Sequence, residues 1–133
     1  MLRRWFPTVA AAAATLWVAG CSTDLGSCPP GSEAQQALGQ LVVSDYCSQC
    51  HDTGSNGVNR AGAPSGLDWN DLSTVRDWAG EMYGETKDGE MPPKEFSSGG
   101  MLFPLGRPST EELENMRVWL ACGAQNFMEM ETP

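Results

Sequence analysis

The sequence is poor in histidine and in positive charge, and each shortage excludes a class of function. Its only histidine, His51, excludes any site in a single chain that needs two imidazoles. Eight basic residues face seventeen acidic ones. Residues 21–133 contain six of the basic residues and all seventeen acidic ones, so their formal net charge is 6 − 17 = −11. Nucleic acid is therefore not an expected partner, and a basic protein surface fits the charge better.

Long apolar runs are also scarce, and the one that exists lies at the start of the sequence. Arg3 and Arg4 precede "VAAAAATLWVAG", an apolar run of about half the roughly 20 residues that a membrane-spanning helix needs. The run ends in "VAGC", which resembles the bacterial lipobox. That resemblance implies a signal peptide over residues 1–20, cleavage before Cys21, and acylation of Cys21. An ordinary signal peptide with an incidental Cys21 is the alternative.

The remaining chain has the length of one domain. Residues 22–32, "STDLGSCPPGS", are rich in Ser, Gly and Pro, which predicts a flexible linker over residues 21–32 that begins at the lipidated cysteine. The folded domain is expected over residues 33–133. Alternating strand patterns are absent, so we expect an all-α fold.

The motif "CSQCH" carries the chemistry of the chain, and it allows three interpretations. Cys47 and Cys50 could form a redox dithiol, but such pairs follow a strand, and the preceding residues here have helical spacing. A zinc site would need a fourth ligand beside Cys47, Cys50 and His51. As a haem c attachment motif, each thiol bonds one vinyl group and His51 binds iron, which fits an exported protein best.

Two helical patterns flank this motif. Apolar residues recur with helical spacing before the motif, and Gly39 interrupts them, which predicts close approach of another helix. Near the end of the chain, Ser109 and Glu112 form a capping box, and an apolar face follows as far as Gly123. A middle helix is expected over residues 73–83.

Taken together, these features resemble the class I monohaem cytochromes c, in particular the small bacterial lipoprotein type. In that family a glycine eight residues before the first haem cysteine lets the terminal helices cross, and Gly39 stands at that position. Val43 and Trp119 match the apolar and aromatic packing positions. The resemblance implies the cytochrome c fold, one covalent haem c, and a proline carbonyl that accepts the haem-histidine N–H, a role assigned to Pro64.

No second histidine exists, so the iron would have either a methionine as its second ligand or an open sixth position. Met91 lies in "DGEMPPK", forty residues after His51, and Met-Pro-Pro resembles the family's axial loop. A thioether is a weak ligand, so a stiff loop helps to hold it, and Pro92 and Pro93 have fixed φ. Met101 is the alternative ligand. The predicted iron ligands are thus His51 and Met91.

Cys28 and Cys122 remain after the other cysteines are assigned. A disulfide between them would join the linker to the last helix. A buried free thiol at Cys122 beside an incidental Cys28 is the alternative.

These features predict a one-electron carrier that is not an enzyme and takes no small-molecule substrate. It would be anchored by lipid on the periplasmic side of a bacterial membrane, with Ser22 favouring the outer membrane, and would exchange electrons with redox partner proteins. Three alternatives stay open: a haem-based gas or redox sensor, a peroxidase-type enzyme, and an electron-transfer subunit of a larger oxidoreductase.

Overall fold

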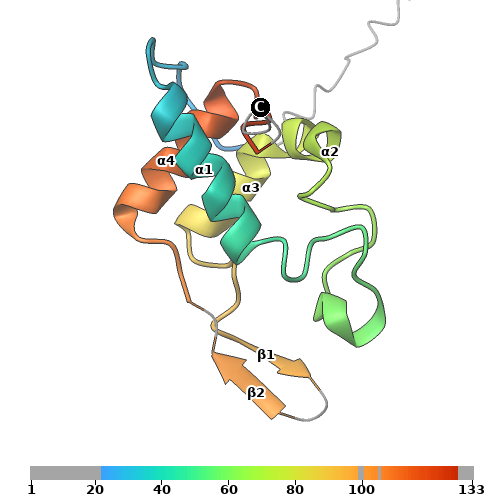
Figure 1. Ribbon diagram of the computed structural model, residues 1–133. Helices are drawn as coiled ribbons and strands as arrows, with labels where there is room; N and C mark the ends of the chain where they lie inside the picture. The colour runs from blue at the N-terminus through green and yellow to red at the C-terminus, as the bar shows by residue number, and fades with distance from the viewer. Residues whose placement is uncertain (1–21, 99–100, 105, 129–133) are drawn as a thin grey trace, which may run out of the picture.

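The computed structural model describes residues 22–98, 101–104 and 106–128. Helices dominate it, so the expected all-α class is confirmed at that level (Figure 1). The described elements are α1 (Glu33–Tyr46), a 3-10 turn (Gly57–Arg60), α2 (Leu72–Asp77), α3 (Ala79–Lys87), β1 (Glu95–Ser98), β2 (Met101–Pro104) and α4 (Thr110–Ala121).

Helices α1 and α4 cross in direct contact, and Gly39 makes that contact possible (Figure 1). A methyl group at Gly39 would overlap the carbonyl of Asn115 and would lie only 2.7 Å from the Cβ of Trp119. Backbone atoms cannot rotate away as a flexible side chain can, so only glycine fits here. The predicted close approach of another helix is confirmed.

The core lies where α4 meets α1 on one side and α2 and α3 on the other. Trp119 is 1% exposed, and Val43 packs with it in the same cluster. The Trp119 indole N–H donates to the carbonyl of Gln125 at 2.7 Å, which satisfies the polar edge of a ring buried among apolar groups. Other buried members of this cluster are Val42, Val75, Ala79, Met82, Met116, Leu120 and Ala124.

The predicted capping box at the start of α4 is confirmed. The Ser109 hydroxyl accepts from the Glu112 N–H, while the Glu112 carboxylate accepts from the Ser109 N–H at 2.7 Å. The Tyr46 hydroxyl also donates to Glu112, which ties the end of α1 to the beginning of α4. At the other end, Gly123 has φ 84°, the left-handed conformation expected where a helix stops.

The middle helix is divided, which corrects the expectation of one helix over residues 73–83. Trp78 (φ −114°, ψ 15°) ends α2, and α3 begins at the next residue. Asp71 caps α2 by accepting from the Ser73 N–H at 3.0 Å. The Trp78 carbonyl accepts from Met82 at 2.9 Å, so α3 continues from the break. The change of direction lets both Val75 and Met82 reach the core.

A short antiparallel hairpin, β1–β2, lies between α3 and α4 and was not predicted. Its register pairs Glu95 with Pro104 and Ser98 with Met101. In the sequence, a Gly-Gly dipeptide separates the two strands, and that arrangement is a recognised hairpin signal. The strands were missed because neither has four residues of clear polar–apolar alternation.

The segment expected to be a flexible linker is instead packed against the helices, which corrects that expectation for residues 22–32. Residues 22–28, called the strap below, lie along α3 and α4. Leu25 packs on the core, and its carbonyl accepts from the Arg117 guanidinium at 2.5 Å. The packing of Leu25 and the hydrogen bond from the charged Arg117 hold this segment in place, although its composition alone predicts a flexible linker.

The strap ends at a disulfide. Cys28 and Cys122, the predicted pair, are bonded in the structure with their Cα atoms 4.7 Å apart, so the strap is joined covalently to the end of α4. Among the described ranges, none of the helices combines the length and apolar character needed to cross a bilayer. Cys21 and residues 1–20 lie outside the described residues.

Candidate functional site

The three residues of the predicted attachment motif lie in one helical turn that continues from α1. The Cys47 N–H donates to the carbonyl of Val43 at 3.0 Å, as in the helix itself. The N–H groups of Cys50 and His51 then both donate to the carbonyl of Cys47, at 3.2 and 3.0 Å. This turn sets the two thiols and the imidazole at the end of a helix that packs on α4.

Both thiols are free and held in the protonated form. Burial raises the pKa of Cys47 to about 12, with a further contribution from the neighbouring Cys50. Burial also raises the pKa of Cys50, although the charge of Arg60 opposes this. Reactive redox dithiols have a lowered thiol pKa, because the thiolate is the nucleophile. The electrostatics of this turn therefore do not match a redox dithiol.

The imidazole of His51 has one nitrogen committed to the backbone. Nδ1 lies 2.7 Å from the carbonyl oxygen of Leu67. A carbonyl oxygen only accepts, so Nδ1 carries the proton and donates, and neutral His51 keeps the lone pair on Nε2. The residue is 9% exposed, and burial lowers its pKa, which favours the neutral form that a metal requires.

The acceptor for His51 is Leu67 and not Pro64, which corrects the role given to that proline. The Pro64 carbonyl accepts instead from the Arg60 guanidinium at 2.6 Å. Pro64 and Leu67 lie at the two ends of one turn, in which the Leu67 N–H faces the Pro64 carbonyl at 3.4 Å. The turn points the Pro64 carbonyl toward Arg60 and leaves that of Leu67 for the imidazole.

Trp69 packs beside this imidazole. The two ring centroids are 5.0 Å apart with an interplanar angle of 26°. The backbone N–H of Trp69 also donates to the His51 carbonyl at 2.8 Å. The ring also borders a hollow of about 230 Å³ that reaches Ser48, between the two thiols in sequence. Val43, Leu72 and Trp119 supply apolar walls of the same hollow. His51 is therefore fixed both by its hydrogen bond and by stacking.

Arg60 holds the loop between His51 and α2 in shape. Its guanidinium forms a partly buried ion pair with Asp68 at 2.7 Å and donates to the carbonyls of Asp52 at 2.9 Å and Ala63 at 3.1 Å. Its donors are thus committed within the loop. Asp68 follows Leu67 directly, so the ion pair also fixes the carbonyl that His51 uses.

Met91 lies in a turn fastened to the end of α3. The N–H groups of Glu90 and Met91 both donate to the carbonyl of Glu85, at 2.9 and 3.0 Å. The Met91 side chain is 41% exposed, while Pro92 is buried behind it. Arg107 lies against the backbone of Gly89, whose φ is 79°. The thioether is thus presented at the surface by a turn that several contacts hold.

The predicted site residues are only partly brought together. Cys47, Cys50 and His51 share one turn, whereas Met91 occupies a separate turn after α3. Within residues 22–98, 101–104 and 106–128, no three side chains of His, Cys, Asp or Glu gather as a metal-ligand set. Cys21, the predicted lipidation site, lies outside the described residues.

The donor atoms of the motif turn fit a covalent haem. A thiol contains both the sulfur and the hydrogen that would add across a vinyl double bond, and the neutral His51 imidazole has the Nε2 lone pair that iron would need. The fixed Nδ1 hydrogen bond is the arrangement by which proteins orient a metal-bound imidazole. Cys47, Cys50 and His51 are the residues that would hold the group.

Two contacts of His51 were not identified from sequence. Leu67 contributes a backbone carbonyl, which any residue type provides, so no side-chain signal exists for it. Trp69 could have been suspected as one of only five tryptophans, located in the loop after the motif, but its position beside His51 depends on the path of that loop.

Comparisons with protein-family models, curated proteins and solved structures gave no match to this chain. The residues and their geometry therefore carry the functional conclusion.

Proposed function

We propose that the protein is a one-electron carrier with a single haem c bound through Cys47 and Cys50 and ligated by His51 and Met91. The observation that carries this proposal is the state of His51, with Nδ1 donating to Leu67 and the Nε2 lone pair free. The crossing of α1 and α4 at Gly39, with the motif turn directly after α1, supports a cytochrome c fold.

The attachment chemistry suits the thiols as they stand. Each S–H would add across one vinyl double bond, with sulfur bonding to one carbon and hydrogen to the other, so attachment would consume no outside oxidant. The Cys28–Cys122 disulfide leaves Cys47 and Cys50 as the free thiols in the described part of the chain. This pairing prevents the sulfurs of Cys28 and Cys122 from competing with them.

The axial ligands then determine the function. A bound haem supplies the electron that is gained or lost, and a neutral thioether favours ferrous iron, hence a relatively high reduction potential. The chain's own contribution is to orient the His51 imidazole through Leu67 and Trp69 and to hold Met91 on a constrained turn. If His51 and Met91 both bind the iron, no open ligand position would remain for a substrate.

Lipid on Cys21 would place the carrier on the periplasmic face of a bacterial membrane. Partners would be redox proteins, and the net charge of −11 for residues 21–133 favours a basic docking surface on them. A free-standing carrier and an electron-transfer subunit of an oxidoreductase share this chemistry.

The Met91→Ala variant tests the ligand assignment. We expect loss of the weak near-red absorption band of a sulfur–iron bond, and a fall in reduction potential on the order of 0.1 V within the roughly 0.8 V range that axial ligands span. Optical redox titration of mature protein from a host with cytochrome c maturation measures both.

Leu38→Ala is the control, because Leu38 is similarly exposed and lies on α1 outside the hollow that Trp69 borders. Its spectrum and potential should equal those of the wild type. An unchanged Met91→Ala spectrum would move the ligand to Met101. Ready binding of carbon monoxide by the ferrous wild type at neutral pH would instead favour a sensor.

A further inference from the structure

The strap determines which face of the molecule can meet a membrane. Two glycines of α3, Gly80 and Gly84, are one helical turn apart and form a shallow track for it. A methyl group at Gly80 would lie 2.9 Å from the Thr23 carbonyl oxygen and 3.0 Å from the Ser22 Cβ. A methyl group at Gly84 would overlap the Thr23 hydroxyl.

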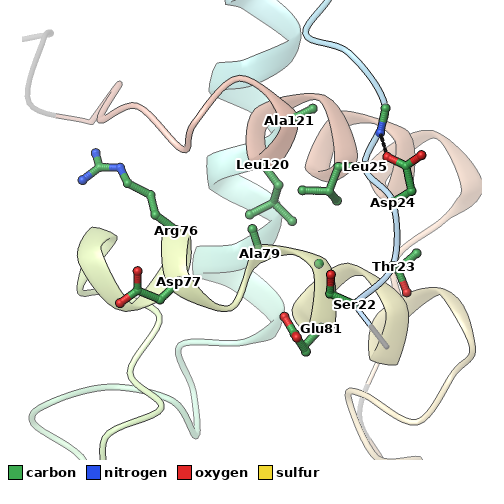
Figure 2. Close-up of a pocket in the computed structure, with 12 residues that line it drawn as sticks. Ser22, Thr23, Asp24, Leu25, Arg76, Asp77, Ala79, Glu81, Leu120 and Ala121 are labelled. Carbon is green, nitrogen blue, oxygen red and sulfur yellow. Dashed lines mark hydrogen bonds between the residues drawn. The ribbon is translucent and has the colours of Figure 1, made fainter. Parts of the chain in front are cut away.

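Contacts beyond the glycine track hold the strap at several further points. Leu25 points toward Leu120 of α4 above Ala79 (Figure 2). The Leu25 carbonyl accepts from Arg117, and Arg117 is itself paired with Glu114 at 2.6 Å. The Asp24 carboxylate accepts from the Gly26 N–H at 2.8 Å and closes a turn. The disulfide at Cys28 then prevents the strap from separating from α4.

This packing shortens the reach of anything attached at position 21. A free segment of twelve residues could extend about 40 Å from the folded domain. With Ser22 seated beside Gly80, only one Cα–Cα step of about 3.8 Å separates position 21 from a residue in contact with α3. An acyl group on Cys21 would therefore bring this surface of α3 to the lipid headgroups.

We propose that the surface formed by Ser22–Asp24 and the first turns of α3, with Glu81 at its edge, is the membrane-facing side of the protein. The occupant is the lipid surface that receives the acyl chains of Cys21, and the proposal rests on the lipidation included in the proposed function. Figure 2 shows Ser22 and Glu81 next to one another at this side. The domain sits on the membrane in one orientation rather than rotating on a tether.

Helix α1 contributes no residue to the surface around Ser22–Asp24, which is lined by the strap, α2, α3 and α4. Helix α4 packs on both α1 and α3. Leu38, Leu41 and Asp45 are exposed on α1. In the proposed orientation this exposed part of α1 stays in water, available to soluble partners. Asp45 therefore serves as a reference position for measuring orientation.

Photocrosslinking to lipid tests this orientation without relying on haem. The full mature chain, carrying a benzophenone amino acid at position 81 or at position 45, is reconstituted in phosphatidylcholine vesicles. This lipid avoids repulsion between anionic headgroups and the carboxylates of Asp24, Asp77 and Glu81. We expect roughly tenfold more lipid adduct at position 81, because effective concentration falls steeply with the length of a tether.

A strap-release variant, Gly80→Leu/Gly84→Leu, should bring the two adduct yields close to equality, because the leucines occupy the path of Ser22 and Thr23. Lys87→Leu, which adds a leucine to an exposed position of the same helix, should keep the wild-type ratio. If the release variant loses its helical circular dichroism signal, the adduct yields at positions 81 and 45 of the otherwise wild-type chain still test the proposed orientation.

Each outcome has a defined meaning. Equal adducts at positions 81 and 45 in the wild type, with the acyl mass present on the N-terminal peptide, would overturn the orientation and leave electron transfer untouched. Absence of the acyl mass would overturn the orientation together with lipidation. Loss of the Met91-dependent spectrum would affect only the carrier assignment, because the crosslinking does not depend on iron.

Discussion

Replacing Gly39 by valine is expected to lower the free energy of unfolding by about 3 kcal/mol. The valine Cβ would overlap the Asn115 carbonyl and press on the Trp119 Cβ, so α1 and α4 must separate. Separation opens the core around Trp119 and Val43, the largest packed region of this small domain. Because the motif turn continues directly from α1, its position relative to the loop that carries Leu67 should also loosen.

Denaturant unfolding of the mature protein, followed by far-UV circular dichroism, measures this loss. Ala34→Val is the matched control: it puts the same β-branched side chain on the same helix at an exposed position, and it should cost less than about 1 kcal/mol. Equal unfolding midpoints for Gly39→Val and the wild type would show that the helices do not cross here.

Removing the disulfide is expected to have the largest effect on stability. Cys28 and Cys122 are 94 residues apart, and in the chain-entropy model a loop of this length contributes about 4–5 kcal/mol. The Cys28→Ser/Cys122→Ser variant should therefore melt about 15 °C or more below the wild type. The strap should also become accessible to protease, because the bond is what fastens its end to α4.

The two single variants serve as internal controls. Either serine alone breaks the bond, so Cys28→Ser, Cys122→Ser and the double variant should melt within a few degrees of one another. A reductant should lower the melting temperature of the wild type and leave the double variant unchanged. A double variant that melts with the wild type would mean that the strap is held without the disulfide.

The helices and their crossing could be predicted because their signals are local. The Ser109–Glu112 spacing is a capping box by sequence, and the structure forms both of its hydrogen bonds. Gly39 interrupts a helical pattern at a cost of about 1 kcal/mol, which implied a compensating contact, and Asn115 and Trp119 provide it. In both cases the residue type itself carries the physical reason.

The surroundings of His51 could not be predicted because they depend on backbone geometry. The acceptor is a carbonyl, so Leu67 and Pro64 are indistinguishable as acceptors from sequence. Arg60 decides between them by drawing the Pro64 carbonyl and Asp68 to its guanidinium. A long loop organised by one arginine has no periodic pattern from which its path could be read.

The packing of the strap could not be predicted from its composition alone. Ser, Gly and Pro predict a linker when no partner surface is known. Its partner is a pair of glycines about sixty residues later in the sequence, and nothing in the sequence marks Gly80 and Gly84 as a packing surface for it. Trp78 was likewise placed within one continuous helix, whereas it divides α2 from α3.

Covalent haem at Cys47 and Cys50 is the central claim, and intact-mass spectrometry of the mature protein tests it most directly. Expression in a host with a cytochrome c maturation system should give a red protein whose mass exceeds that of the polypeptide by one haem, in denaturing solvent. The Cys47→Ser/Cys50→Ser variant should lack both the colour and the added mass. A colourless wild type of unmodified polypeptide mass from the same host would contradict the claim.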